Sequence, residues 1–147
     1  MFKRLCVATD GSSSSQRAVK AAAELANKID ASLLLVHVIR EMKVPEELKR
    51  YIKADALGEP RHEVLQEVGE KILSQCQAIA VEAGVSSIKS KILDGDPALS
   101  IVNEARSSSA DLIVLGTRGL GKIEGMFIGS VSRKIADISD ISVLIIK

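Results

Sequence analysis

A glycine-rich run in the last third of this sequence has the residue types and spacing to bind an anion. It reads G-T-R-G at 116–119 and continues, after nine further residues, with Gly129 and Ser130. Glycine has no Cβ and tolerates positive φ, so Gly116 and Gly119 let the chain fold back close to a ligand. Ser130 is a favoured N-cap residue, and the free N–H groups and positive dipole end of a helix start favour negative charge. The run therefore predicts a phosphate-binding loop.

Other side chains add hydrogen-bond donors around this loop: Thr117, Arg118, Lys122 and Ser132. The stretch GTRGLGK at 116–122 has the spacing of a Walker A loop, but Ile123 stands where that loop needs a Ser or Thr to ligate Mg²⁺. The helix also starts later than it does after a P-loop lysine. The G-x-G-x-x-G fingerprint of dinucleotide-binding proteins is absent as well. Neither common nucleotide motif applies, and an ordinary glycine turn is the alternative interpretation.

Asp10 is the second residue with chemical potential, because it ends the apolar segment LCVAT and precedes Gly11 and Ser12. An Asp in such a place often organises the turn and caps the helix that follows. Open α/β sheets, however, bind ligands beyond the carboxyl ends of their strands, which is where Asp10 would lie. Both interpretations are open from the residues alone.

The elements that must position these residues alternate between short β-branched runs and amphipathic stretches. Strands are predicted at about 4–9, 32–38, 87–93, 111–115 and 142–146. Asp96 with Pro97 predicts an N-cap and first-turn proline for a helix that runs to about Arg106, and Ser130 is predicted to begin the last helix. This order predicts an α/β fold, namely an open, doubly wound, five-stranded parallel sheet with helices on both faces.

Helical spacing of apolar residues predicts the faces that turn towards the sheet. The residues on these inward faces are Val19, Ala22, Ala23, Ala26 and Ile29 in the first helix, Val64, Leu65, Val68, Ile72, Ile79 and Ala83 in the second, and Val131, Ile135 and Ile138 in the last.

Composition fits a single domain over residues 1–147, since a chain of about this size buries roughly 68–70% of its unfolded surface. Aromatic residues make up only 2%, which favours an aliphatic core typical of parallel sheets and argues against stacking platforms for single-stranded nucleic acid. A net charge of +1 gives no global attraction to nucleic acid or to an anionic membrane. No run approaches the ~20 apolar residues of a membrane span and no signal peptide is evident, so we expect a cytoplasmic protein.

Two cysteines and two histidines do not make a convincing zinc cluster. Cys6 and Cys76 fall on apolar positions and are expected to be small buried hydrophobes. His37 is expected to pack in the interior and His62 to face solvent. The two acids Asp94 and Asp96 are assigned to the turn and the N-cap.

The motif G-x2-G-x9-G-S resembles that of the nucleotide-binding members of the universal stress protein family. The resemblance covers the whole chain, since RLCVATDGSSSSQRAVKAAAELA, LLLVHVI, DGDPA and VSRKIADISDISVLIIK follow one another as in that family. It implies the strand order 3-2-1-4-5, with the first and fourth strands adjacent and their following helices on opposite faces. It also implies that Asp10 binds the ribose, with a phosphate-bound metal as the second choice for this carboxylate.

The resemblance implies ATP as the ligand, accompanied by Mg²⁺, with no metal ligand assigned to the protein. An adenine pocket needs an apolar slot, which the ends of the first, second and fourth strands would form, and in the family the equivalents of Ala8 and Val38 contact the base. The predicted binding residues are Ala8, Thr9, Asp10, Val38, Leu115, Gly116, Arg118, Gly119, Gly129, Ser130, Val131 and Ser132. No catalytic residue is predicted, because no second acidic residue is placed to orient water for phosphoryl transfer.

The sequence ends in SVLIIK, a short aliphatic strand at the predicted sheet edge, and such an edge aggregates unless it is paired or covered. The resemblance implies pairing with the same strand of a second copy, so we expect a homodimer through Ser142–Ile146, although Ser142 stands where many relatives carry proline. The lysine-rich segment from Arg40 to Lys53 is expected to be a connection or a short helix over the binding cleft.

The leading hypothesis is an ATP-binding, dimeric universal stress protein that regulates an unidentified downstream protein in response to nucleotide. One alternative is a slow Mg²⁺-dependent ATPase or a nucleotide-dependent transferase. A second is an interaction module of the same fold that binds no nucleotide.

Overall fold

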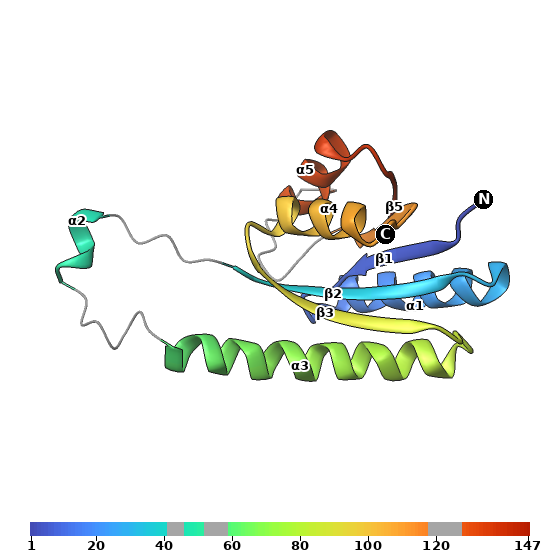
Figure 1. Ribbon diagram of the computed structural model, residues 1–147, viewed down its shortest axis with the longest axis horizontal. Coiled ribbons are helices and arrows are strands. Elements are labelled where there is room, and N and C mark those ends of the chain that lie inside the picture. Colours follow the sequence, from blue (N-terminus) through green and yellow to red (C-terminus); the bar gives the residue numbers. More distant parts are fainter. Residues whose placement is uncertain (41–45, 52–58, 118–127) are drawn as a thin grey trace.

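Five parallel strands form the centre of the protein in the order β3-β2-β1-β4-β5 (Figure 1). This computed structural model describes residues 1–40, 46–51, 59–117 and 128–147. The strands are β1 (Arg4–Ala8), β2 (Ser32–Arg40), β3 (Ile88–Gly95), β4 (Leu112–Gly116) and β5 (Ser142–Ile146). The helices are α1 (Ser13–Ile29), α2 (Glu46–Lys49), α3 (Glu59–Glu82), α4 (Pro97–Ser107) and α5 (Ser130–Ile138). The predicted strand order and parallel sheet are confirmed.

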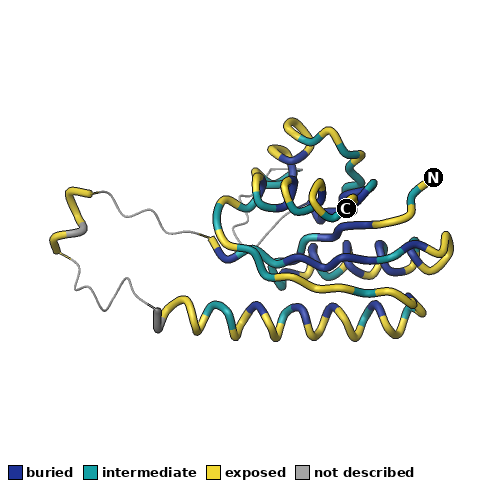
Figure 2. The backbone as a smooth tube through the Cα atoms, viewed as in Figure 1, coloured by how far each residue is buried: buried dark blue, intermediate teal, exposed yellow. Residues whose placement is uncertain are grey.

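Helices cover both faces of the sheet, as the doubly wound prediction requires (Figure 1). Alternate residues of β1 show this directly, because Leu5 and Val7 pack with α1 and α3 whereas Cys6 packs with α4 and α5. Buried residues accordingly follow the strands and the inward sides of the helices (Figure 2). Since β1 and β4 are neighbours and α1 and α5 lie on opposite faces, the chain switches direction between these two strands.

Strand β2 continues to Arg40, two residues beyond the predicted end, because its pairing with β3 continues through polar positions. The register runs from Leu33 opposite Ile88 to Arg40 opposite Gly95. Ile39 is still buried, but Arg40 is exposed and its partner strand continues through Asp94 and Gly95, so apolar periodicity does not reveal this end of the ladder.

Helix α1 begins where Ser12 caps it, since the Ser12 hydroxyl accepts a hydrogen bond from the Ser15 N–H at 3.2 Å. It ends at Asp30, which adopts a left-handed conformation with φ 56°. The inward face is buried as predicted over Val19, Ala22, Ala23 and Ala26. Ile29 is an exception, because it lies in the last turn and is exposed.

The predicted inward face of α3 is wrong at its two valines, since Val64 is 58% and Val68 46% exposed. The buried stripe instead contains Gly69, Leu73 and Cys76. A Cβ at position 69 would lie 2.8 Å from Cδ2 of His37, so the missing side chain lets the helix approach β2. The helix therefore turns its glycine, rather than its first valines, towards the sheet.

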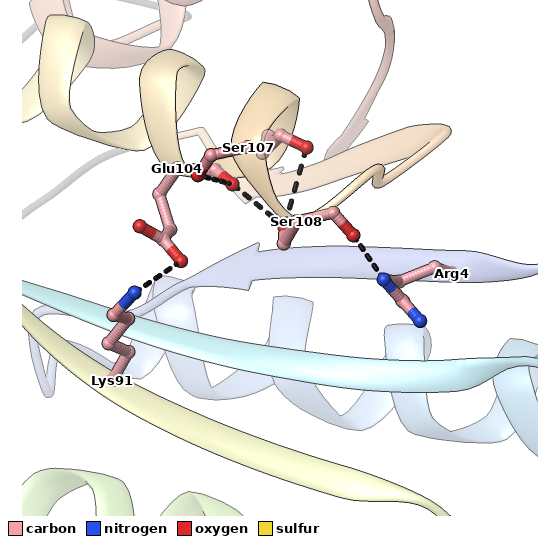
Figure 3. A network of polar contacts seen from close by, with 6 residues as sticks. Arg4, Lys91, Glu104, Ser107 and Ser108 are labelled. Atoms are coloured by element: carbon pink, nitrogen blue, oxygen red, sulfur yellow. Dashed lines mark hydrogen bonds and ion pairs between the residues drawn. The ribbon is translucent and has the colours of Figure 1, made fainter.

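Helix α4 starts as predicted, with Asp96 as N-cap accepting from the Leu99 N–H at 3.0 Å and Pro97 in the first turn. A polar network holds its other end (Figure 3). The hydroxyl of Ser108 donates to the Glu104 carbonyl at 2.7 Å, and the Arg4 side chain donates to the Ser108 carbonyl. These contacts tie α4 to the start of β1.

The two shortest helices, α2 and α5, differ in how they lie relative to the sheet. In α5, Ile135 is fully buried, whereas Ile138, also predicted to face inward, is exposed. Helix α2 stands apart from the sheet in Figure 1 rather than against the strand ends, and residues 41–45 and 52–58 of the same segment lie outside the described residues.

Within the described residues, no helix has the length and apolar character to cross a membrane.

The end of β4 meets the first turn of α1 so closely that only glycine fits between them. A Cβ on Gly116 would lie 2.6 Å from the Ser14 Oγ and 2.8 Å from the backbone carbon and oxygen of Ser14. Gly116→Ala should therefore destabilise the fold by about 1–3 kcal/mol, because helix and strand must separate. Urea denaturation of the variant measures this loss.

The matched test adds Ser14→Ala to the Gly116→Ala protein and compares the pair with Ser14→Ala alone. Because the backbone of Ser14 is part of the clash, removing its hydroxyl should not restore stability. Recovery in the double variant would show that the hydroxyl alone sets the distance.

Candidate functional site

The carboxyl ends of β1 and β4 lie beside each other at one edge of the sheet. The two strands pair directly, with Cys6 opposite Ile113 and Val7 opposite Val114. The loop after β1 leads into α1 on one face, and the segment after β4 leads to α5 on the other. A crevice at such a reversal of strand order is the usual ligand site of open α/β sheets.

Asp10 has a structural role in the loop after β1. Its Oδ1 accepts a hydrogen bond from the Ser12 N–H at 2.9 Å, and Gly11 between them takes a positive φ of 84°. This bond holds Ser12 in place to cap α1. The turn-organising role proposed for Asp10 is therefore present, and the same bond fixes the half-buried carboxylate at the strand edge.

Thr9 fixes the base of the same loop from the α1 and α3 side. Its hydroxyl is 3.1 Å from the Ser15 Oγ and accepts from the Cys76 Sγ at 3.6 Å. The His37 Nδ1 donates to the Thr9 carbonyl at 2.9 Å. Because a carbonyl oxygen can only accept, the proton is assigned to this ring nitrogen. At 4% exposure, Thr9 holds the loop together and offers its side chain to α1 and α3 rather than to the carboxyl edge.

Gly116 lies within β4, paired with Ile146, and not in the loop. It is not among the positive-φ residues of the described chain, so its glycine is required by the contact with Ser14 and not by an unusual backbone conformation. Its carbonyl accepts from the Ser132 hydroxyl at 2.7 Å. That bond joins the end of β4 to the first turn of α5.

The two ends of the glycine motif meet. The Gly129 N–H donates a hydrogen bond to the Thr117 carbonyl, so the chain returns to β4 directly before α5. Arg118 and Gly119, both predicted to bind phosphate, lie outside the described residues, as does the rest of 118–127. The described part of the motif thus forms one edge of the site.

The start of α5 differs from the predicted cap. Gly129, with φ −68° and ψ 162°, is the N-cap, and no side chain caps the helix, whereas Ser130 is the first helical residue. Serine is a favoured N-cap, which is why Ser130 is predicted in that role. The hydrogen bond from Gly129 to Thr117 instead makes Gly129 the cap, so the helix starts one residue earlier than predicted. First-turn N–H groups have no intrahelical partner, so the backbone of Ser130 and Val131 presents donors to an anion.

Ser132 is less available than the sequence suggests. Its hydroxyl proton goes to the Gly116 carbonyl, and the residue is buried. As a hydroxyl has a single proton to donate, Ser132 could offer an anion its backbone N–H but not this hydroxyl proton.

An apolar surface adjoins these donors on the α4 and α5 side of the sheet. Ala8 on β1, Val38 on β2 and Val131 on α5 are half-buried and pack on the same core cluster. Leu115 belongs to that cluster but is only 3% exposed, so it lies beneath this surface. Leu93 was not predicted, although it pairs with Val38 and is also half-buried, and the signal for it is the apolar position near the end of β3.

The acidic residues near this edge are engaged in structural contacts. Hydrogen bonds from the Leu99 N–H and the Lys134 ammonium lower the pKa of Asp96 from its ordinary value. Asp94 binds the His62 Nε2 at 2.8 Å, so His62 is partly exposed as predicted but paired. Within the described ranges, no group of three or more His, Cys, Asp or Glu residues is arranged to hold a metal ion.

Both thiols are buried, as expected, and Cys76 contacts Thr9 beneath the loop after β1. Burial raises the pKa of Cys6 to about 12. Burial also raises the pKa of Cys76, although the hydrogen bond to Thr9 opposes the shift. The site therefore has an apolar surface, a fixed carboxylate and a helix start with open backbone donors, and no reactive thiolate.

Known proteins share this arrangement of strands and helices. The model of the Universal stress protein family matches residues 1–147. The universal stress protein YxiE of Bacillus subtilis is 37% identical over 150 residues, which cover 100% of both chains.

Two solved structures show the same fold. A universal stress protein in complex with cAMP is 29% identical, with a TM-score of 0.70 over 99% of this chain and 97% of that one. The universal stress protein UspA from Lactobacillus plantarum is 22% identical, with a TM-score of 0.83 over 99% of this chain and 98% of that one. With the family model matched from end to end and a close full-length relative in sequence, this chain belongs to the universal stress protein family.

Proposed function

We propose that this protein binds ATP, with Mg²⁺, at the carboxyl edge of β1 and β4, and that it acts as a dimeric, nucleotide-responsive regulator. The observation that carries the proposal is the start of α5, where a helix with no side-chain cap is joined by Gly129 to the end of β4. It lies beside the half-buried apolar surface of Ala8, Val38 and Val131. An apolar slot next to backbone anion donors suits a base linked to phosphate.

The adenine base is assigned to the apolar surface. A relative at 29% identity was solved with cAMP, an adenine nucleotide, which supports this choice of base. Val131 belongs both to this surface and to the first turn of α5, so base and phosphate sites are continuous. A base resting on Ala8 and Val38 would therefore direct its phosphates towards Ser130.

The ribose is assigned to Asp10. Its Oδ1 is held by the Ser12 N–H, which fixes the orientation of the carboxylate before a ligand arrives. A carboxylate accepts several hydrogen bonds, so a ribose hydroxyl can donate to it alongside that N–H. Mg²⁺ would accompany the phosphates, since the described residues provide no cluster of three or more metal ligands.

Binding without efficient catalysis is the favoured activity. Phosphoryl transfer needs a residue that positions the attacking group, in addition to charge neutralisation. Two acidic residues lie near the end of β3 on the α4 side. Asp94 is paired with His62, and Asp96 accepts hydrogen bonds from the first turn of α4 and from Lys134. These pairings support a regulator that responds to occupancy.

A homodimer through β5 completes the proposal. Strand β5 is the last strand of the described sheet, and Val143 to Ile146 are all partly exposed. Ser142 keeps its backbone N–H, unlike proline, so the full strand can donate to a neighbouring strand. Pairing of two copies along β5 would cover this aliphatic edge.

Gly129→Val tests the phosphate site. The backbone at Gly129 lies in an extended region that valine also adopts, so the fold should be retained, whereas the added side chain would stand at the helix entrance. We expect ATP affinity, measured by isothermal titration calorimetry with Mg²⁺, to fall at least about tenfold, or ~1.4 kcal/mol. Equal affinity in a folded Gly129→Val protein would remove α5 from the site.

The ribose assignment is tested by a cycle of two ligands and two variants. Wild-type protein should bind ATP more tightly than 2′,3′-dideoxy-ATP by about 1–2 kcal/mol, the value of a charge-assisted hydrogen bond. Asp10→Ala should abolish that difference, and Asp10→Asn, which keeps an acceptor for the Ser12 N–H, should reduce it without loss of stability. If Asp10→Ala weakened both nucleotides equally, the carboxylate would act only through the turn.

Light scattering tests the dimer. Wild-type protein is expected to have twice the chain mass, and Ile145→Lys should shift it towards monomer by placing charge on the β5 edge. Val81→Lys is the matched control, because Val81 is an exposed residue of α3 on the other side of the molecule. A concentration-independent monomer mass in the wild-type protein would contradict the proposed assembly.

A further inference from the structure

Strand β3 forms the second edge of the described sheet, far in the strand order from β5. It pairs with β2 over its whole length, from Ile88 to Gly95. The Leu33 N–H donates to the Ser87 carbonyl, so strand alternation turns the backbone groups of Lys89 and Lys91 towards β2. Those of Ser90 and Ile92 then point away from the sheet. Within the described residues, no further strand pairs with this outer side.

A groove runs along this edge between β3 and α3, which lie next to each other in Figure 1. Its volume is about 400 Å³. The residues on its walls are Gln66, Glu70, Leu73, Ser74 and Gln77 of α3, with Ser90, Lys91 and Ile92 of β3. The groove therefore lies beside the two β3 residues whose backbone groups point outward, and its α3 wall is polar apart from Leu73.

The groove is acidic on its α3 side. Glu70 lies on its wall, and Glu63, two helical turns earlier, projects from the same side of α3 and is exposed. Glu67 is exposed one turn before Glu70. These three carboxylates form an acidic stripe along the groove, with Lys71 as the nearest basic residue of the helix.

Lys91 also lines the groove, but its ammonium is paired with a residue of α4 rather than with this stripe. Side chains alternate between the faces of a strand, so Lys89 and Lys91 project towards the α4 face. The Lys91 Nζ lies 3.0 Å from the Glu104 Oε1 of α4, an ion pair visible in Figure 3. The outer edge of β3 thus has an acidic α3 side and a basic α4 side.

We propose that an extended segment of a partner protein pairs with β3 as an additional strand and places basic side chains in the groove against Glu70 and Glu63. Backbone pairing to Ser90 and Ile92 supplies affinity, and the alternating charge supplies selectivity. The partner segment carries Lys or Arg at alternate positions that face α3. This surface lies on the opposite side of the sheet from the apolar surface assigned to the base, and the inference does not depend on nucleotide binding.

A second copy of this chain fits the edge less well. Antiparallel self-pairing centred on Ser90 or Lys91 would place Lys89 or Lys91 opposite a lysine of the other copy, and like charges in that position repel. Lysines on an edge strand are a common protection against such pairing. A partner with the complementary pattern avoids this repulsion.

The test titrates the whole protein with a peptide of about seven residues, alternating Thr and Lys, which matches the usual length of a strand. Two-dimensional NMR follows the amide resonances. We expect saturable shifts confined to 88–94 and to the facing side of α3, and binding at least about fivefold weaker for the peptide with Glu in place of Lys. Equal binding of both peptides, no saturable binding, or shifts centred on β5 would overturn the proposal.

Three variants separate charge from backbone pairing. Glu70→Gln should weaken the lysine peptide about three- to fivefold, the range of an exposed ion pair. Glu82→Gln is the matched control, because Glu82 is an exposed acid of α3 beyond the groove, and should leave affinity unchanged. Ser90→Pro should weaken binding at least about tenfold while β3 keeps its pairing with β2, since edge strands accept proline where the N–H points outward.

If Ser90→Pro unfolds, the lysine peptide methylated on its threonine nitrogens replaces it and should bind at least about tenfold more weakly. Unchanged binding in Glu70→Gln, or to the methylated peptide, would overturn the proposal. Shifts at 88–94 that depend on protein concentration alone would assign the edge to a second copy instead.

Discussion

The contact between Gly116 and the first turn of α1 is the constraint on which the rest of this structure depends. A Cβ at that position would collide with the backbone of Ser14, so strand and helix meet at a distance that other residues do not permit. The Gly116 carbonyl also receives the Ser132 hydroxyl, which sets the position of α5. One glycine therefore positions a helix on each face of the sheet, and the carboxylate of Asp10 and the donors of α5 take their places relative to it.

The parts of the fold that follow from local rules were predictable. Alternating β-branched runs gave all five strands, and Asp96 with Pro97 gave the α4 start, because both depend on short-range geometry. The strand order came from resemblance to a family, since periodicity contains no information on it. The inward face of α3 could not be predicted from apolar spacing, because the absence of a side chain at Gly69 decides the closest approach to His37.

The surroundings of the predicted site residues could be foreseen only in part. Ala8, Val38 and Val131 pack on one core cluster, whereas Leu115 is buried within it and the Thr9 side chain is directed to α1 and α3. Cap preference predicts Ser130 as the N-cap of α5. A hydrogen bond from Gly129 to Thr117 makes Gly129 the cap instead, and Ser130 becomes the first helical residue. The supporting contacts of Cys76 and His37 join distant segments, and no local pattern indicates them.

The central place of β1 has a consequence for the order in which the molecule can assemble during synthesis. The chain emerges from its N-terminus, so β1, β2 and β3 with α1 and α3 can pair first, leaving one side of β1 open until β4 is made. Residues 5–7 lie opposite residues 112–114 of β4, so this edge of β1 stays open until β4 arrives. A ribosome-bound chain that ends before β4 would thus expose the apolar strand β1 as an open sheet edge, the kind of surface that chaperones recognise, and would lack the β4 half of the candidate site.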